Sequence, residues 1–153
     1  FGPRQSQRAI IPTIIVQILQ GKKTINLGSL HTYRDFNFVE DTSEAIIRLA
    51  SNPKTLGETY NIASNYYIQI KDIVKMISKL MNKKIDIKII KERSRNKKYE
   101  VSKLLGDNSK MKKVINWSPK FSGRKNFPKG LEKTINWYKN NLSLIKNKDK
   151  LFL

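Results

Sequence analysis

The chain has 153 residues, enough for one domain with a hydrophobic core, and 39% of them are hydrophobic. It holds no cysteine and one histidine, His31, which excludes disulfides, thiol chemistry and a multi-histidine metal site. The net charge is +19, and residues 1–69 carry only 7 basic and 5 acidic side chains, so most of the excess charge lies in the remainder.

The first expected elements are an apolar helix and a short strand. Residues 9–19 are apolar on nearly all sides, with Pro12 in the first turn and Gly21 as the stop signal. Such a helix needs cover on every side. We therefore expect it to rely on a part of the protein outside this sequence, and the chain alone to be poorly soluble or partly unfolded. Residues 24–27 are predicted to form a strand.

Next comes a strand that runs into a helix. Over residues 34–38 side chains of two kinds alternate, which is the period of a strand with two different faces. Arg34 stands where this strand meets a loop, and an arginine fixed there can offer a planar fork to a phosphate. The alternative is a surface arginine that pairs with Asp35 or Glu40. The residues alone leave both interpretations open.

A helix should follow, from residue 39 to about residue 51, with Asp41 or Thr42 as its cap. Its expected buried stripe consists of Ala45, Ile46, Leu49 and Ala50.

The remaining segments alternate between the two-residue period of a strand and the 3.6-residue period of a helix. In chain order we predict a strand over residues 58–63, a helix from about residue 70 to 81, a strand over 85–89, a helix over 110–115 and a helix over 128–142. Asp107 is the expected cap of the helix over 110–115. Trp117, Trp137 and Tyr138 are expected core anchors. Strands separated by helices indicate an α/β fold.

Four short stretches together resemble one family. RDFNFVED at residues 34–41 resembles the RDF-x-[FY]-V-x-D signature of extended short-chain dehydrogenases/reductases, and more narrowly of nucleotide-sugar epimerases and 4,6-dehydratases. FGPRQ at residues 1–5, GETYNI at 57–62 and WSP at 117–119 resemble three further motifs of that family, in the same order. Each is short, and their order and separations make the set specific.

The resemblance covers residues 1–141 and implies the C-terminal, substrate-binding part of an extended Rossmann-type fold, with residues 142–153 as a lysine- and asparagine-rich tail. In the whole protein it implies NAD-dependent dehydratase or epimerase chemistry. NAD would be bound by an N-terminal half missing here, since no G-x-G-x-x-G is present. Tyr99 and Lys103 are four residues apart, but they lie in a polar connector and we interpret the spacing as coincidence. No catalytic residue is therefore expected in this chain, which should be inactive alone.

The resemblance also implies site residues. An arginine at the position of Arg34 grips the diphosphate of the sugar nucleotide in that family. Gln69 takes the place of a small polar residue or asparagine that helps hold the phosphates. Arg95, with Arg93 as the second choice, takes the place of a further phosphate-binding arginine in the connector over residues 91–98.

Two more arginines, Arg4 and Arg8, precede the first helix and are either ligands or solvated. The expected partners are a nucleotide sugar and, in the full-length protein, a second copy in a homodimer. The sugar, the base and the choice between dehydratase and epimerase stay open. The longest apolar run, over residues 9–16, is too short to span a bilayer, and a cytoplasmic protein is the default.

The basic second half allows a different function. A basic, non-catalytic binding module for nucleic acid or a protein partner is the alternative. Against it, 24 of the 31 basic residues are lysines scattered singly, and no basic ribbon interleaved with aromatic residues stands out.

Overall fold

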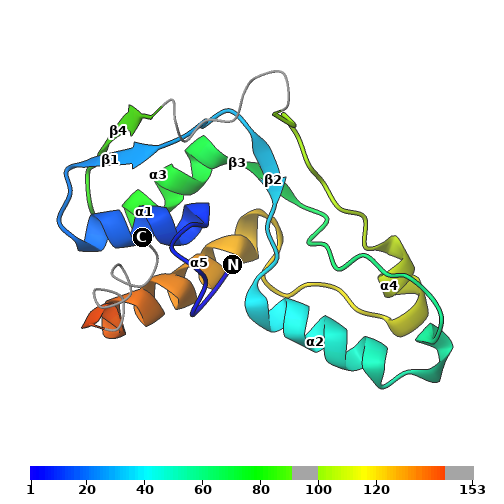
Figure 1. Ribbon diagram of the computed structural model, residues 1–153. Helices are drawn as coiled ribbons and strands as arrows, with labels where there is room; N and C mark the ends of the chain where they lie inside the picture. Colours follow the sequence, from blue (N-terminus) through cyan, green and yellow to red (C-terminus); the bar gives the residue numbers. More distant parts are fainter. Residues whose placement is uncertain (91–99, 144–153) are drawn as a thin grey trace.

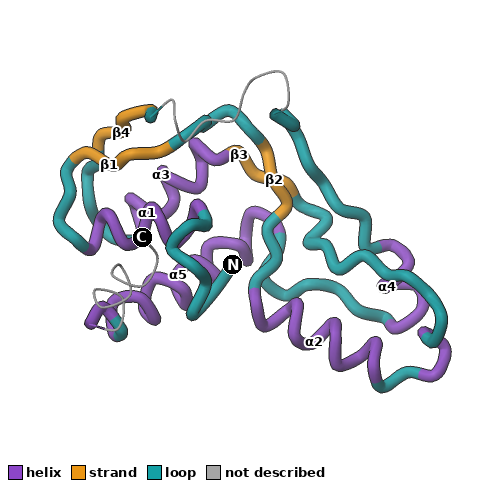
Figure 2. Tube along the Cα trace, viewed as in Figure 1, coloured by secondary structure: helices purple, strands orange, loops and turns teal. Residues whose placement is uncertain are grey.

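The structure, a computed structural model, describes residues 1–90 and 100–143 (Figures 1 and 2). In chain order its elements are α1 (Ile10–Leu19), β1 (Thr24–Leu27), β2 (Tyr33–Asp35), α2 (Val39–Ala50), the 3-10 helix η1 (Pro53–Thr55), β3 (Tyr67–Gln69), α3 (Ile70–Leu80), β4 (Asp86–Ile89), α4 (Ser109–Ile115) and α5 (Gly123–Asn140). β1 pairs with β4 in parallel, and β2 pairs with β3 antiparallel. Short strands thus alternate with helices, which confirms the α/β class.

Figure 1 shows two groups of elements on either side of the β2–β3 pair. The larger lobe comprises α1, α3, α5, β1 and β4, and the smaller lobe comprises α2, η1 and α4. In the larger lobe Ile11, Ile14 and Ile15 of α1 are fully buried, because α1 packs against α3, α5 and β1. The expectation that α1 needs cover from outside this chain is therefore wrong.

Gln17 of α1 completes one edge of the β1–β4 sheet. Its side-chain amide donates to the carbonyl of Asn26 at 3.2 Å, and its oxygen accepts the Asn26 N–H at 2.8 Å. The side chain thereby takes the place of a neighbouring strand at the middle of β1. This contact explains how a two-stranded sheet can border a helix without leaving the backbone of Asn26 unsatisfied.

The smaller lobe has its own small core, in which Ala45 of α2 meets Met111 of α4 and the fully buried Trp117. The predicted stripe of α2 is only partly correct. Ala45 is buried and Leu49 packs against this core, but Ile46 is 54% exposed and Ala50 is exposed. Residues spaced by four share a helix face, so the face that holds Ala45 and Leu49 turns inward and Ile46 turns away.

The predicted cap of α2 is also wrong. The helix begins at Val39 after Phe38, which places Asp41 inside the first turn with 2% exposure. Its carboxylate accepts the backbone N–H groups of Lys120 and Phe121 at 2.8 and 2.9 Å, and it serves as an anchor for another segment.

The strand predicted over residues 58–63 is absent from the described fold. Side chains of other segments bind its carbonyl groups instead of a neighbouring strand. Asn37 Nδ2 donates to the carbonyl of Ile62, and Asn108 Nδ2 donates to that of Ala63, each at 2.9 Å. An alternating sequence predicts an extended backbone, but a strand forms only where a partner lies beside it.

Two helix starts differ from the prediction. α5 begins at Gly123, so Pro128 lies inside it and not at its start. α4 begins at Ser109 after Asn108, while the Asp107 carboxylate accepts the Ser109 N–H at 2.8 Å. Trp117 and Tyr138 are buried as predicted, and Trp137 is half-buried. None of the helices in the described ranges is long and apolar enough to cross a membrane.

Candidate functional site

Arg34 lies on the central strand of a small three-stranded arrangement. β3 flanks β2 on one side, with Arg34 opposite Ile68. On the other side the N–H of Tyr33 donates to the carbonyl of Ser102 at 2.8 Å, and the carbonyl of Tyr33 accepts the N–H of Leu104 at 3.1 Å. Backbone bonds on both sides therefore fix the Cα position of Arg34.

The guanidinium of Arg34 does not pair with either carboxylate named in the alternative interpretation. Asp35 binds backbone N–H groups, and Glu40 binds Lys133 Nζ at 2.8 and 2.9 Å. Arg34 Nη1 donates to the carbonyl of Tyr33 at 2.7 Å. In the described part of the chain no carboxylate lies within ion-pair distance of this partly buried arginine. Its charge is thus not neutralised by any side chain that the structure describes.

Asp35 joins three segments at the end of β2. Its carboxylate accepts the N–H of Ser64 at 2.9 Å, that of Asn65 at 3.1 Å and that of Gly106 at 3.2 Å. Gly106 is required at this junction, because a Cβ there would stand 2.4 Å from the Cβ of Ala63. Hydrogen bonds to a charged acceptor are stronger than neutral ones, so Asp35 is the main anchor beside Arg34.

The structure does not bring Gln69 to the face of Arg34. Gln69 lies opposite Tyr33, whereas Arg34 lies opposite Ile68. Directly opposite residues in an antiparallel pair share a face and successive residues alternate, so Gln69 and Arg34 project from different faces. Consistently, Gln69 Nε2 donates to the carbonyl of His31 at 3.3 Å. A ligand role for Gln69 stays a prediction.

The loop that carries Arg4 and Arg8 is anchored at both ends of its motif. The hydroxyl of Tyr138 donates to the carbonyl of Gln5, and burial raises the pKa of that hydroxyl to about 12. Gly2 approaches Val39 so closely that a Cβ on it would stand 2.5 Å from Val39 Cγ1. Arg4 and Arg8 themselves are exposed, and their roles as ligands stay predictions. Arg93 and Arg95 lie outside the described residues.

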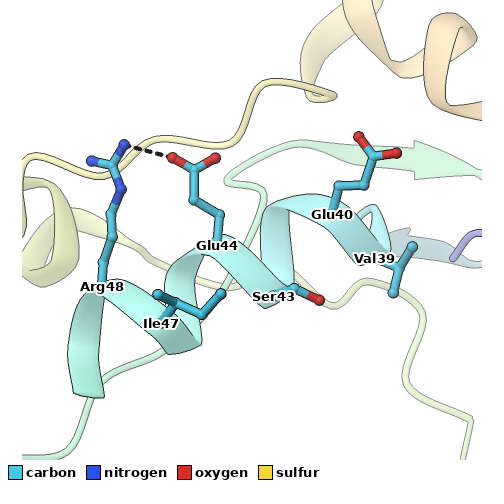
Figure 3. A pocket seen from close by; sticks show the side chains of 6 residues that line it. All are labelled: Val39, Glu40, Ser43, Glu44, Ile47 and Arg48. Atoms are coloured by element: carbon cyan, nitrogen blue, oxygen red, sulfur yellow. Dashed lines mark hydrogen bonds and ion pairs between the residues drawn. The ribbon is translucent and has the colours of Figure 1, made fainter. Parts of the chain in front are cut away.

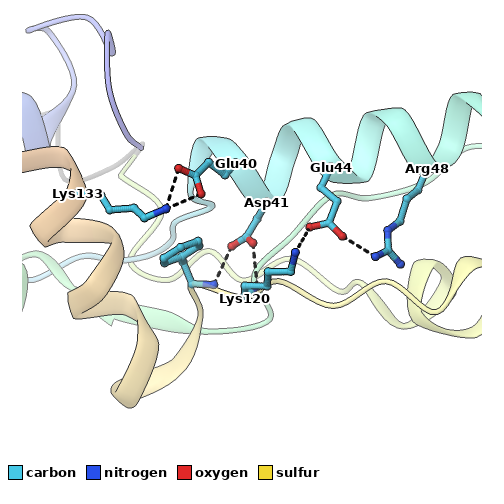
Figure 4. A network of polar contacts seen from close by, with 7 residues as sticks. Glu40, Asp41, Glu44, Arg48, Lys120 and Lys133 are labelled. Atoms are coloured by element: carbon cyan, nitrogen blue, oxygen red, sulfur yellow. Dashed lines mark hydrogen bonds and ion pairs between the residues drawn. The ribbon is translucent and has the colours of Figure 1, made fainter. Parts of the chain in front are cut away.

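The motifs meet around the start of α2. The carbonyl of Phe1 accepts the N–H of Val39 at 2.8 Å, and the Phe1 ring lies 5.3 Å from that of Phe38. Asp41 holds the segment that follows the WSP motif, as Figure 4 shows. In the same figure Glu44 joins Lys120 Nζ at 2.8 Å, and this hydrogen bond, followed by that from Arg48, lowers the pKa of Glu44. These motif residues therefore hold the scaffold of the site.

Sequence reasoning missed Asp35, Asn37 and Asp41 as anchors. A usable signal was present, because each is a short polar side chain inside an otherwise apolar motif, and such residues bind backbone groups readily. The residues that the structure describes contain no group of three or more His, Cys, Asp or Glu side chains able to hold a metal ion.

Comparison with known proteins identifies relatives. The sequence model of the GDP-mannose 4,6 dehydratase family matches residues 1–132. The chain is 26% identical to dTDP-glucose 4,6-dehydratase 1 of Escherichia coli K12, over 96% of this chain and 40% of that protein. The structure of dTDP-glucose 4,6-dehydratase from Bacillus anthracis in complex with NAD has a TM-score of 0.79 at 30% identity, over 94% of this chain and 43% of that one.

A third relative is the UDP-glucuronic acid 4-epimerase of Bacillus cereus, solved with UDP-glucuronic acid and NAD. It has a TM-score of 0.80 at 26% identity, over 92% of this chain and 42% of that one. The chain thus spans less than half the length of these relatives. Because the family match covers most of the sequence and the fold agrees, the chain belongs to the GDP-mannose 4,6-dehydratase family, among the nucleotide-sugar dehydratases and epimerases of the extended short-chain dehydrogenase/reductase class.

Proposed function

We propose that this chain is the sugar-nucleotide-binding part of an NAD-dependent nucleotide-sugar 4,6-dehydratase or epimerase, with Arg34 as a ligand of the diphosphate. Family membership supports the enzyme class. The observation that carries the residue assignment is the state of Arg34: it is fixed on a central strand, and no described carboxylate pairs with it. A planar guanidinium in this state suits bidentate recognition of a phosphate.

The described residues do not fit an NAD site. A dinucleotide pyrophosphate binds where a glycine-rich turn leads from a strand into a helix N-terminus. β2 leads to α2 through Phe36, Asn37 and Phe38, and β3 leads into α3 directly at Ile70, so neither junction has a glycine. We infer that NAD is bound by the portion of the parent protein that this chain does not span, and we assign no reaction step to it here.

This chain's contribution is to hold and orient the substrate. A hydrogen bond to a charged group contributes about 1.5 to 3 kcal/mol. A bidentate contact from Arg34 would fix the diphosphate at one end and thereby restrict where the hexose lies. Positioning of this kind lowers a reaction barrier by removing translational and rotational freedom in advance.

Binding of dTDP-glucose and UDP-glucose to the chain, measured by titration calorimetry, tests the proposal. Arg34→Ala should weaken binding by about 2 to 4 kcal/mol, somewhat more than one charged hydrogen bond. Arg34→Lys should restore only part of the loss, because an ammonium keeps the charge but not the fork. Arg48→Ala is the matched control, since Arg48 is an exposed arginine that pairs with Glu44 on α2.

Normal binding by Arg34→Ala together with a melting temperature many degrees lower would show that Arg34 is structural. The basic-module alternative has its own readout. DNA binding that falls steeply with salt, with no response to the sugar nucleotides, would favour nucleic acid as the partner.

A further inference from the structure

Two tight turns in the larger lobe carry a pair of lysines each. One turn follows α1 at Gly21 and the other follows α3 at Asn82, with φ of 78° and 50°. The backbone N–H of the next residue, Lys22 or Lys83, donates to a carbonyl in the last turn of its helix, at 3.2 and 3.0 Å. The two turns therefore have the same form. We call their four exposed lysines the lysine cluster: Lys22, Lys23, Lys83 and Lys84.

The parallel sheet places the two turns side by side. Thr24, the first residue of β1, lies opposite Asp86, the first residue of β4, and the N–H of Asp86 donates to the carbonyl of Lys23 at 2.8 Å. Each lysine pair stands just before these strand starts, and neighbouring strands lie about 4.8 Å apart. Figure 1 shows the two turns next to each other at the left of the larger lobe. Lysines far apart in the sequence therefore share one small area of the surface.

The charge of the lysine cluster is not balanced by the part of the chain that the structure describes. No ion pair among the described residues involves any of the four lysines. Asp86 is the acidic side chain at the start of β4, so four positive charges stand against one negative charge there. The C-terminal ends of α1 and α3 carry partial negative charge, which favours lysines at this position. That interaction leaves the ammonium groups exposed to solvent.

The charged side chains along α2 show the opposite arrangement. Figure 3 shows Glu44 joined to Arg48, at 2.5 Å, and Glu40 binds Lys133 at 2.8 Å. Charges of both signs are paired on that surface, so the electric field that it produces is weak. The lysine cluster instead gathers charges of one sign, and such a surface raises the local concentration of anions.

A row of lysines continues the positive surface along α3. Lys71, Lys75 and Lys79 are spaced by four, so they share the exposed face of the helix, and Lys75 also pairs with Asp72 at 3.5 Å. Eight residues of helix are about 12 Å long. The lysine cluster and this row therefore form an elongated surface, which suits a chain of phosphates better than a single small anion.

We propose that the lysine cluster, together with the row on α3, binds the phosphate backbone of a nucleic-acid duplex without reading its sequence. Lysine is a compact charge that binds phosphate without a fixed geometry. The residues that form the surface are all lysines, so it offers no aromatic ring on which the bases of a single strand could stack. It also offers no apolar side chain, which stable membrane binding needs in addition to a basic patch. The inference does not rest on Arg34.

Titration of a fluorescein-labelled DNA duplex with the chain, followed by fluorescence anisotropy at several salt concentrations, tests the inference. The variant Lys22→Gln/Lys23→Gln/Lys83→Gln/Lys84→Gln should bind at least tenfold more weakly at low salt, because it removes four phosphate contacts. Its plot of log K against log salt concentration should be shallower by about 3 to 4, since each contact contributes about 0.9 to the slope. The control variant replaces four exposed lysines spread over other helices in the same way: Lys54→Gln/Lys112→Gln/Lys125→Gln/Lys139→Gln.

The control variant should bind the duplex within threefold of the parent, because it changes the net charge equally but leaves the lysine cluster intact. Both variants should bind UDP-glucose as the parent does and melt within a few degrees of it. Failure of the parent chain to bind the duplex at low salt would overturn the inference, as would equal weakening in the two variants. If the cluster variant loses binding to phosphatidylserine vesicles but keeps binding to the duplex, the surface binds a membrane and the assigned partner is wrong. A chain that binds the duplex through the cluster but not UDP-glucose would contradict the proposed function and leave this inference intact.

Discussion

The two lobes differ in how completely they bury the apolar side chains of a helix. In the larger lobe α1 is apolar on nearly all sides and is enclosed by α3, α5 and β1, so that Ile11, Ile14 and Ile15 have no exposed surface. In the smaller lobe α2 is amphipathic, yet Ile46 and Ile47 face outward. Within this chain the apolar side chains of α1 are therefore covered more completely than those of α2.

The apolar content of a helix indicates how much surface the helix must bury, but not which part of the protein covers that surface. The larger lobe closes on itself because three elements converge on α1. In the smaller lobe α4 and one extended segment pack with α2 around a small core, which covers only one side of α2.

The largest expected effect separates the lobes by stability. Ile15→Ala removes a fully buried side chain from the core of the larger lobe and should lower the free energy of unfolding by about 2 to 5 kcal/mol. Ile46→Ala shortens an exposed side chain and should change it by less than about 0.5 kcal/mol. Urea unfolding monitored by circular dichroism measures both. Equal losses would mean that the outward-facing side chains of α2 are already covered in the isolated chain, which would remove the contrast between the lobes.

A smaller effect is expected where the lobes are joined. Asp41→Ala leaves the N–H groups of Lys120 and Phe121 without their acceptor, and an unsatisfied buried donor costs about 1 to 3 kcal/mol. Asp41→Asn keeps one acceptor oxygen and should lose less. Asp72→Ala is the control, because among the described residues Asp72 pairs with Lys75 at 3.5 Å on the exposed surface.

Thermal melting followed by the fluorescence of the buried Trp117, in a Trp137→Phe background, reports this loss of stability within the smaller lobe. If Asp41→Ala and Asp72→Ala melt alike, then Asp41 does not anchor the segment after the WSP motif. The smaller lobe would in that case be held by its small core alone.

Local patterns predicted the elements whose partners lie inside the chain. The strand over residues 24–27 has the predicted bounds, and α1 and α3 follow the predicted apolar periodicity. The strand over residues 58–63 failed because strand formation depends on a neighbour, and the buried face of α2 was predicted only in part because periodicity does not say where a core lies.

The same division applies to the site. The alternation over residues 34–38 placed Arg34 on a strand, as the structure has it, although β2 ends at Asp35. The register of β2 with β3 depends on residues far apart in the sequence, so the opposite faces of Arg34 and Gln69 could not be predicted. Asp41 was interpreted as a cap because its backbone partners follow residue 119, in a loop that no local pattern connects to it.

The smallest expected effect tests the exposed contact between the lobes. Glu44 accepts hydrogen bonds from Lys120 and from Arg48, at 2.8 and 2.5 Å, and the Lys120 bond is the larger cause of its lowered pKa. Because the pKa is lower in the folded state, the stabilisation is fully present above the unfolded value of about 4.3 and is lost as pH falls through the folded value. Lys120 is mostly exposed, so Glu44→Gln should lower the free energy of unfolding at pH 7 by only about 0.2 to 1 kcal/mol. The difference between Glu44→Gln and the parent should shrink below pH 4 and in 1 M salt, where exposed charges are screened.

Glu132→Gln, on the exposed face of α5, is the control and should match the parent throughout. A difference that persists unchanged at pH 3 would mean that Glu44 acts through packing and not through its charge.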